Sequence, residues 1–180
     1  MRIRKILLKL RGMQIGDGTV IPKCLVTWPH QVKIGKRCIL QPDIFFNYDH
    51  YWTPGPSIRV GNRIFIGRGV EFNIKGGIDI GDDCLIASGC IFVDSNHGVL
   101  PDLAMNQQPL VVCPIKIGNN AWIGARSIIL KGVTIGEGSV IGAGSVVTKS
   151  IPAGEIWVGN PARFKKKISE SIRNFNNLPA

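Results

Sequence analysis

Charged residues are scarce in this chain of 180 residues: they make up 19% of the sequence, against 44% for apolar residues. That balance excludes an intrinsically disordered protein, which would be poor in apolar residues and rich in charge. The sequence also has no uncharged apolar run near the roughly 18 residues that a membrane-spanning helix needs. One globular domain, with at most a short appendage, is therefore expected at this length.

Signals for export are lacking as well. The five cysteines are an odd number and none of them forms a Cys-x-x-Cys pair, so nothing indicates a disulfide framework. Lys5 and Lys9 interrupt what would be the apolar stretch of a secretion signal, and no small-residue cleavage site follows. Together these absences predict a cytoplasmic protein.

The net charge of +10 is concentrated in two terminal segments that contain few acidic residues. Residues 1–14 hold five basic residues and no acid, residues 163–173 hold five basic residues and one acid, and the remainder is nearly neutral. No DNA- or RNA-binding motif accompanies these segments, so nucleic-acid binding is not expected. Basic segments of this kind suit other anions, such as cofactor phosphates, an acidic glycan or an anionic membrane surface.

Residues 1–14 are expected to be helical, because Ile3, Ile6, Leu7 and Leu10 fall on one helical face. Two interpretations of this segment stay open. A basic amphipathic helix can lie on a membrane surface, or the helix can cap the domain by docking on it.

Glycine, by contrast, is abundant, at 22 residues, and it follows a six-residue pattern. From residue 117 the chain reads IGNNAW, IGARSI, ILKGVT, IGEGSV, IGAGSV and VTKSIP, in which position one is always Ile or Val and position two is usually Gly. The same template begins upstream at Ile15, Ile34, Val60 and Ile80. Such self-similarity at a short fixed period predicts a stacked β-helix over residues 15–159.

The spacing assigns a role to each position of the repeat. Position one points inward and stacks on its equivalent in the next coil, and three hexads close one triangular coil. Gly at position two allows a sharp turn, because it tolerates positive φ and close backbone approach. Position five also points into the narrow interior, so Cys38, Cys84 and Cys90, which occupy it, are interpreted as small core residues.

Residues that exceed the repeat mark protrusions and ends. Residues 45–59 and 98–114 are predicted to contain loops, and part of the second stretch has enough length to wrap as a coil. After the last coil, Asn160-Pro161 followed by an apolar helical stripe predicts a capping helix over residues 160–180; the stripe consists of Phe164, Ile168, Ile172 and Phe175.

The stretch at residues 117–152 resembles the hexapeptide-repeat acyltransferase family, and within it the galactoside, maltose and polysaccharide O-acetyltransferases. The resemblance extends from Ile15 to Lys166. It implies an all-β fold, a left-handed parallel β-helix with short terminal helices, which is an exception to right-handed crossovers. It further implies a homotrimer, acetyl-CoA as the donor, no metal, and active sites shared between neighbouring subunits.

The resemblance also assigns site residues. His97, in VDSNHG, matches the catalytic histidine of the family and is the candidate general base; His30 and His50 have no such match. A neutral imidazole can take the proton of an acceptor hydroxyl as that hydroxyl attacks a thioester carbonyl. The family's donor-binding positions fall on seven residues here. Trp122 matches an aromatic wall near the reacting centre, and Ala125 and Ala143 match positions whose backbone groups hold the pantetheine arm. Thr148 and Lys149 match a pair at the nucleotide end, and Arg163 and Lys166 match two basic positions near the phosphates.

The acceptor side departs from the galactoside enzyme, whose sugar-contacting residues fall on Gly67 and Lys75 here. We therefore expect a different sugar or a surface-polysaccharide precursor, with Asn73, Lys75 and the aromatic residues of 45–59 as candidate contacts. N-acetylation of an amino-sugar nucleotide is the main alternative, since one histidine base serves both reactions. A zinc hydratase needs about three converging histidines, and a non-enzymatic scaffold would not need His97; both are disfavoured.

Overall fold

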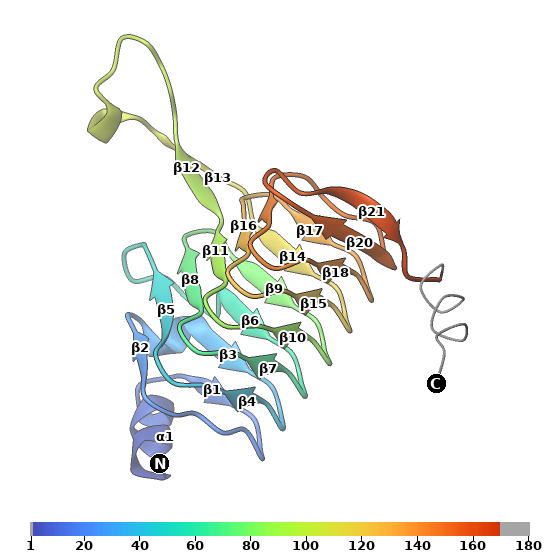
Figure 1. The fold of residues 1–180 in the computed structure, drawn as a ribbon. Coiled ribbons are helices and arrows are strands. Elements are labelled where there is room, and N and C mark those ends of the chain that lie inside the picture. Colours follow the sequence, from blue (N-terminus) through green and yellow to red (C-terminus); the bar gives the residue numbers. More distant parts are fainter. Residues whose placement is uncertain (1, 170–180) are drawn as a thin grey trace, which may run out of the picture.

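The computed structural model describes residues 2–169 and consists of a triangular prism with an N-terminal helix and one long projecting arm (Figure 1). Helix α1 spans Arg2–Leu10, and two short 3-10 helices span Pro29–Gln31 and Met105–Gln107. Parallel strands form the three faces of the prism, as expected for a left-handed β-helix, and one antiparallel strand is added at the C-terminal end of the second face.

The chain visits the three faces in turn. The first face contains β1 (Gln14–Ile15), β3 (Val32–Ile34), β6 (Ile58–Val60), β9 (Ile78–Ile80), β14 (Ile115–Ile117) and β17 (Thr134–Ile135). The second contains β4 (Ile39–Leu40), β7 (Phe65–Ile66), β10 (Leu85–Ile86), β15 (Trp122–Ile123), β18 (Val140–Ile141), β20 (Glu155–Val158) and β21 (Arg163–Lys167). The third contains β2 (Cys24–Val26), β5 (Ile44–Tyr48), β8 (Glu71–Ile74), β11 (Ile91–Val93), β16 (Ile128–Ile129) and β19 (Val146–Val147).

Register follows the six-residue template. On the first face, Ile15 pairs with Ile34, Ile34 with Val60, and Val60 with Ile80, so position-one residues stack from coil to coil. These side chains are buried and form the core together with their equivalents on the other faces. The predicted β-helix and the inward orientation of position one are therefore confirmed.

Glycine at position two allows the backbones of neighbouring coils to approach closely, and its φ angle is not positive there. A Cβ built on Gly118 would lie 2.6 Å from the backbone nitrogen of Glu137 in the next coil, closer than real Cβ contacts allow. Positive φ values occur instead at other turn positions, for example at Gly138 and Asn120. Of the two reasons given for glycine at this position, only close approach applies.

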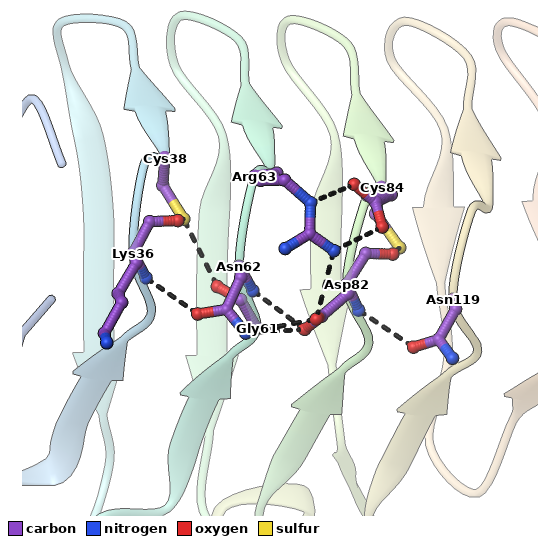
Figure 2. Close-up of polar contacts among 9 residues, drawn as sticks. Lys36, Cys38, Gly61, Asn62, Arg63, Asp82, Cys84 and Asn119 are labelled. Atoms are coloured by element: carbon purple, nitrogen blue, oxygen red, sulfur yellow. Dashed lines mark hydrogen bonds and ion pairs between the residues drawn. The ribbon is translucent and has the colours of Figure 1, made fainter. Parts of the chain in front are cut away.

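Polar side chains link the corners between the first and second faces (Figure 2). In each case a backbone N–H of one coil donates to the side-chain Oδ1 of the equivalent residue in the next coil, at 2.9 Å. The donors and acceptors are Lys36 and Asn62, Asn62 and Asp82, and Asp82 and Asn119. The Asn62 N–H holds the pKa of the Asp82 carboxyl below its usual value. Each turn is thereby fixed to the next, which keeps the coils in register.

The position-five cysteines are buried and donate hydrogen bonds to turns of the next coil, Cys38 and Cys84 at this corner and Cys90 at the corner between the second and third faces, which confirms their interpretation as core residues. The Cys84 thiol lies 3.1 Å from the carbonyl oxygen of Gly118. The Cys38 thiol lies 3.2 Å from that of Gly61 (Figure 2). Burial raises the pKa of the Cys84 thiol, so the proton that makes this bond is retained at neutral pH. In a later coil, Ser139 occupies the same position and donates to the Pro152 carbonyl at 2.7 Å.

Cys84→Ser is therefore expected to change the free energy of unfolding by less than about 1 kcal/mol, because the hydroxyl can make the same bond. Cys84→Leu should cost about 1–3 kcal/mol, because extra methylenes do not fit a packed interior. Denaturant unfolding of the two variants beside the wild type measures both effects. Equal destabilisation by serine and leucine would contradict this account of position five.

The C-terminal expectation needs correction. Arg163–Lys167 do not form part of a helix but strand β21, which pairs antiparallel with β20. Without it, β20 would leave a row of unpaired backbone groups at the edge of its sheet, and the returning strand satisfies them. Most of the predicted 160–180 helix, including Ile172 and Phe175, lies outside the described residues.

The loop expected within 45–59 is shorter than that range. Strand β5 continues to Tyr48 and β6 begins at Ile58, so residues 49–57 form the protruding loop. Aromatic residues before Asp49 belong to the β-helix itself; Phe46 is fully buried and stacks on Phe72 with ring centroids 5.1 Å apart.

Candidate functional site

An arm of residues 94–113 leaves the prism at the corner between the third and first faces (Figure 1). Its base is an antiparallel pair of strands, β12 (Ser95–His97) and β13 (Leu110–Val112), in which His97 lies opposite Leu110. Residues 98–114 thus do not wrap as a coil: the prism continues directly from β11 to β14, and the intervening residues project outward.

The arm is fixed to the prism by Asp94, a buried carboxylate. Its Oδ1 accepts the N–H of Lys75 at 2.8 Å, and its Oδ2 accepts those of Gly76 and Gly77 at 2.7 Å each. Its own carbonyl accepts the N–H of Cys113 at 2.9 Å. Asp94 therefore joins both strands of the arm to the turn of the preceding coil.

Sequence reasoning missed Asp94, although the sequence carries a signal for it. Phe92 is buried, so the inward alternation of the strand places residue 94 inside as well. An acid at an inward position must find hydrogen-bond donors, and a turn containing two consecutive glycines, Gly76 and Gly77, supplies backbone N–H groups.

His97 is exposed on β12, and its ring nitrogens make no hydrogen bond with any residue in 2–169 that the structure records. Its position is set by backbone pairing with Leu110 and by the adjacent Gly98 N–H, which donates to the Pro109 carbonyl at 2.8 Å. The imidazole is thus held on a defined strand while its nitrogens remain accessible to a ligand.

The other two histidines do not lie on the arm: His30 is in the 3-10 helix Pro29–Gln31 and His50 is in the 49–57 loop. His30 Nε2 lies 3.0 Å from the Thr53 carbonyl and its ring centroid lies 5.6 Å from that of Trp52, so this residue holds the 49–57 loop. His50 contacts Tyr51 edge to face. Within residues 2–169, no three His, Cys, Asp or Glu side chains are grouped as a metal site requires.

A depression of about 460 Å³ lies at the corner that carries the arm. Trp28, Tyr48, His50 and Tyr51 supply aromatic surface, and Lys75 lies at its wall, donating from Nζ to the Asp49 carbonyl at 3.1 Å. Asn73 is outside this lining, although it is a hydrogen-bond neighbour of Asn47, which is part of it. Because the Lys75 turn is the one that Asp94 holds, the depression and the arm share a structural element.

The predicted donor residues fall into three groups. Trp122 is half-exposed on β15, and Ala125 and Ala143 lie in successive turns at the corner between the second and third faces, where the Gly144 N–H donates to the Ala125 carbonyl at 2.8 Å. Thr148 and Lys149 are exposed in the turn after β19, at the same corner as the arm but two coils further along.

The third group is basic and lies on β21. Arg163 is exposed opposite Val158, and Lys166 is half-buried opposite Ile156, so both are placed at the C-terminal end of the prism. One subunit therefore brings His97 to the same corner as Thr148 and Lys149, but leaves Trp122 on the second face, which does not adjoin that corner.

Comparison with known proteins agrees with the repeat. Residues 114–149 match the family described as bacterial transferase hexapeptide (six repeats), and residues 57–92 match the hexapeptide repeat of succinyl-transferase. Galactoside O-acetyltransferase of Escherichia coli is 34% identical over 142 residues, which cover 79% of this chain and 66% of that protein.

Two solved structures are similar over most of the chain. A mutant of AntD, an N-acyltransferase from Bacillus cereus, in complex with dTDP-4-amino-4,6-dideoxyglucose and coenzyme A, superposes with a TM-score of 0.70 at 26% identity, covering 97% of this chain and 95% of AntD. A hexapeptide-repeat acetyltransferase from Vibrio cholerae, complexed with acetyl coenzyme A, superposes with a TM-score of 0.64 at 25% identity. The match covers 93% of this chain and 77% of the Vibrio cholerae chain.

The fold and the repeat define a left-handed β-helix protein of the transferase hexapeptide class. The chain belongs to the hexapeptide-repeat acetyltransferase family. It spans 37% of the length of a Mycobacterium tuberculosis relative, which it matches at 37% identity, and 67% of a Dictyostelium discoideum relative, also at 37% identity.

Proposed function

We propose that this protein is a cytoplasmic O-acetyltransferase that moves the acetyl group of acetyl-CoA to a hydroxyl of a sugar or of a surface-polysaccharide precursor. The observation that carries the proposal is His97, an accessible imidazole on a fixed strand, at the corner that also carries an aromatic depression. The five cysteines are free thiols, the state that a reducing compartment maintains.

His97 acts as general base. Its neutral imidazole takes the proton of the acceptor hydroxyl while the hydroxyl oxygen attacks the acetyl carbonyl of the thioester. The carbonyl oxygen becomes an oxyanion that a backbone N–H can stabilise. Collapse of this intermediate breaks the carbon–sulfur bond, the thiolate of CoA leaves and takes the proton that His97 holds, and the acetyl ester of the sugar forms.

Acetyl-CoA binds through the three donor groups. The turns of Ala125 and Ala143 accept the pantetheine arm beside Trp122, and the cationic side chains of Lys149, Arg163 and Lys166 face the phosphates and nucleotide, to which lysine serves as a point charge. Support comes from the Vibrio cholerae structure, which contains acetyl-CoA, and from AntD, which contains coenzyme A.

A homotrimer accompanies this proposal, because one subunit does not bring all these residues together. His97 lies on the arm at the corner between the third and first faces, and Trp122 lies on the second face, so a site that uses both requires the arm of one subunit to meet the second face of its neighbour. Light scattering combined with size-exclusion chromatography measures the mass that this arrangement requires.

The aromatic depression is the candidate acceptor site. Tyrosine and tryptophan rings offer apolar surface with a polar edge, and Lys75 offers a cation to an acidic or phosphorylated sugar. One finding favours a second candidate function: AntD, with its dTDP-linked amino sugar, is an N-acyltransferase. On that alternative the same base would accept a proton from an amine.

An acceptor assay tests the proposal and separates the two reactions. Acetyl-CoA is supplied with hydroxyl sugars, with oligosaccharides and with nucleotide-linked amino sugars, and release of the CoA thiol is followed. The products are then treated with mild alkali, which cleaves an acetyl ester but not an acetamide. Acceptor-dependent thiol release with an alkali-labile product is expected. An alkali-stable product would establish the amine reaction, and no release with any acceptor would contradict acetyl transfer.

A further inference from the structure

Helix α1 carries an apolar stripe that the prism does not cover. Ile3, Ile6, Leu7 and Leu10 recur at the spacing of one helical face, and they are 75%, 56%, 55% and 78% exposed. Four large aliphatic side chains side by side in water are unfavourable, and contiguous exposed apolar surface of this kind indicates an interaction site.

The opposite side of α1 is the one that docks on the protein. Leu8 is buried in the core, Lys5 donates from Nζ to the Thr19 carbonyl at 3.0 Å, and Met13, which follows the helix, is buried as well. The helix is therefore already fixed to the first coil by one face. The exposed stripe is a second face, and it is not needed for that docking.

Basic residues flank the stripe on both sides. At 100° per residue, Lys9 falls about 110° from the centre of the stripe on one side, while Arg4 and Arg11 fall about 90–110° away on the other. All three are exposed, and residues 2–13 contain no acid. An apolar stripe between two cationic borders is typical of helices that lie in a membrane interface.

The position of α1 in the molecule suits such a surface. Figure 1 shows the helix at the end of the prism formed by β1 and β2, at the opposite end from β21. Contact through α1 would leave the three faces of the prism and the arm free. No helix within residues 2–169 is both long and apolar enough to span a bilayer, so the contact concerns the surface.

We propose that α1 is a docking surface for an anionic lipid membrane, in which the Ile3, Ile6, Leu7 and Leu10 side chains enter the headgroup region and the flanking cations face lipid phosphates. The proposal commits to lipid because of charge complementarity: each border is cationic, and membrane surfaces rich in anionic lipid attract such segments. It goes beyond the acetyl-transfer proposal and does not depend on it.

Vesicle flotation tests this surface with the full chain and without acetyl-CoA or acceptor. Vesicles of phosphatidylcholine alone are compared with vesicles containing one part phosphatidylglycerol to three parts phosphatidylcholine, at low and high salt. The wild type should float with the anionic vesicles, at least tenfold more than with the neutral ones, and high salt should weaken the binding. The double variant Leu7→Glu, Leu10→Glu should lose it.

Two double charge reversals with equal net change provide the matched control. Lys9→Glu with Arg11→Glu removes cations from both borders of the stripe, and should lower binding at least tenfold. Lys36→Glu with Lys116→Glu changes exposed lysines outside α1 by the same charge, and should retain binding within about twofold. Equal loss in the two variants would mean that net charge alone attracts the protein, and would overturn a site on α1.

Two further results would also overturn the proposal. One is the absence of wild-type flotation with anionic vesicles. The other is a lower oligomeric mass for Leu7→Glu, Leu10→Glu by light scattering, together with flotation that persists; the stripe would then be a contact between copies of this chain. Circular dichroism confirms that each variant retains the β-helix, so that loss of binding is not loss of folding.

Discussion

His97→Ala is expected to lower the rate of acetyl transfer by about 10²–10⁴-fold, the usual contribution of a general base. The side chain is exposed and its residue is held by backbone pairing with Leu110, so its truncation should leave the arm in place. Acetyl-CoA binding and the free energy of unfolding should therefore stay near their wild-type values. Turnover is measured by release of the CoA thiol at saturating acceptor.

A control on the same arm separates chemistry from structure. Val111 is exposed on β13 next to the residue that pairs with His97, and Val111→Ala should retain turnover within a few-fold. Near-wild-type turnover in His97→Ala would remove this residue from the mechanism.

Asp94→Ala is expected to lower the free energy of unfolding by about 3–5 kcal/mol, because it leaves three backbone N–H groups without their acceptor and each orphaned donor costs about 1–3 kcal/mol. The N–H groups of Lys75, Gly76 and Gly77 would all lose their partner. The arm would also lose its attachment to the preceding turn, so turnover should fall even in molecules that remain folded. Denaturant unfolding and the thiol-release assay measure the two effects.

Two asparagine substitutions provide the comparison. Asp94→Asn keeps the shape of the side chain and one acceptor oxygen, so its destabilisation should lie between those of wild type and Asp94→Ala. Asp102 is exposed near the tip of the arm, and the free energy of unfolding of Asp102→Asn should stay within about 0.5 kcal/mol of the wild-type value. If the free energy of unfolding of Asp94→Ala lies within about 1 kcal/mol of the wild-type value, Asp94 is not the anchor of the arm.

Most of the β-helix could be predicted because its information is local. The inward stacking of Ile15, Ile34 and Val60 follows from a period that is visible in the sequence itself. The interior role of Cys38 follows from the same period, without knowledge of any distant contact. The same six-residue pattern recurs in every coil, so the period stays visible even where a single hexad is irregular.

The arm and the last strand depend on pairing between segments, which periodicity does not reveal. Phe164 belongs to an apolar stripe with helical spacing, yet the open edge of β20 provides hydrogen-bond partners that favour a strand over Arg163–Lys167. Similarly, the pairing of His97 with Leu110 joins residues across a stretch that has no repeat. Tertiary context overrides local propensity at both places.

The family resemblance nominated the candidate site residues individually. It did not predict how they are arranged in space. His97 and Lys149 share a corner and Trp122 does not, because successive faces of the prism turn the chain away. Asp94 was missed because its role depends on the N–H groups of an earlier coil. A site assembled from several coils has no contiguous signature in one sequence.

The donor site is the central claim, and calorimetric titration with acetyl-CoA tests it most directly because it needs no acceptor. The wild type should bind saturably, and Lys149→Ala and Lys166→Ala should each weaken binding by about tenfold, or 1.4 kcal/mol, as expected for loss of a contact between charges. Lys36→Ala, an exposed lysine in a distant turn, should bind as the wild type does. The absence of binding by the wild type at any workable concentration would contradict the account.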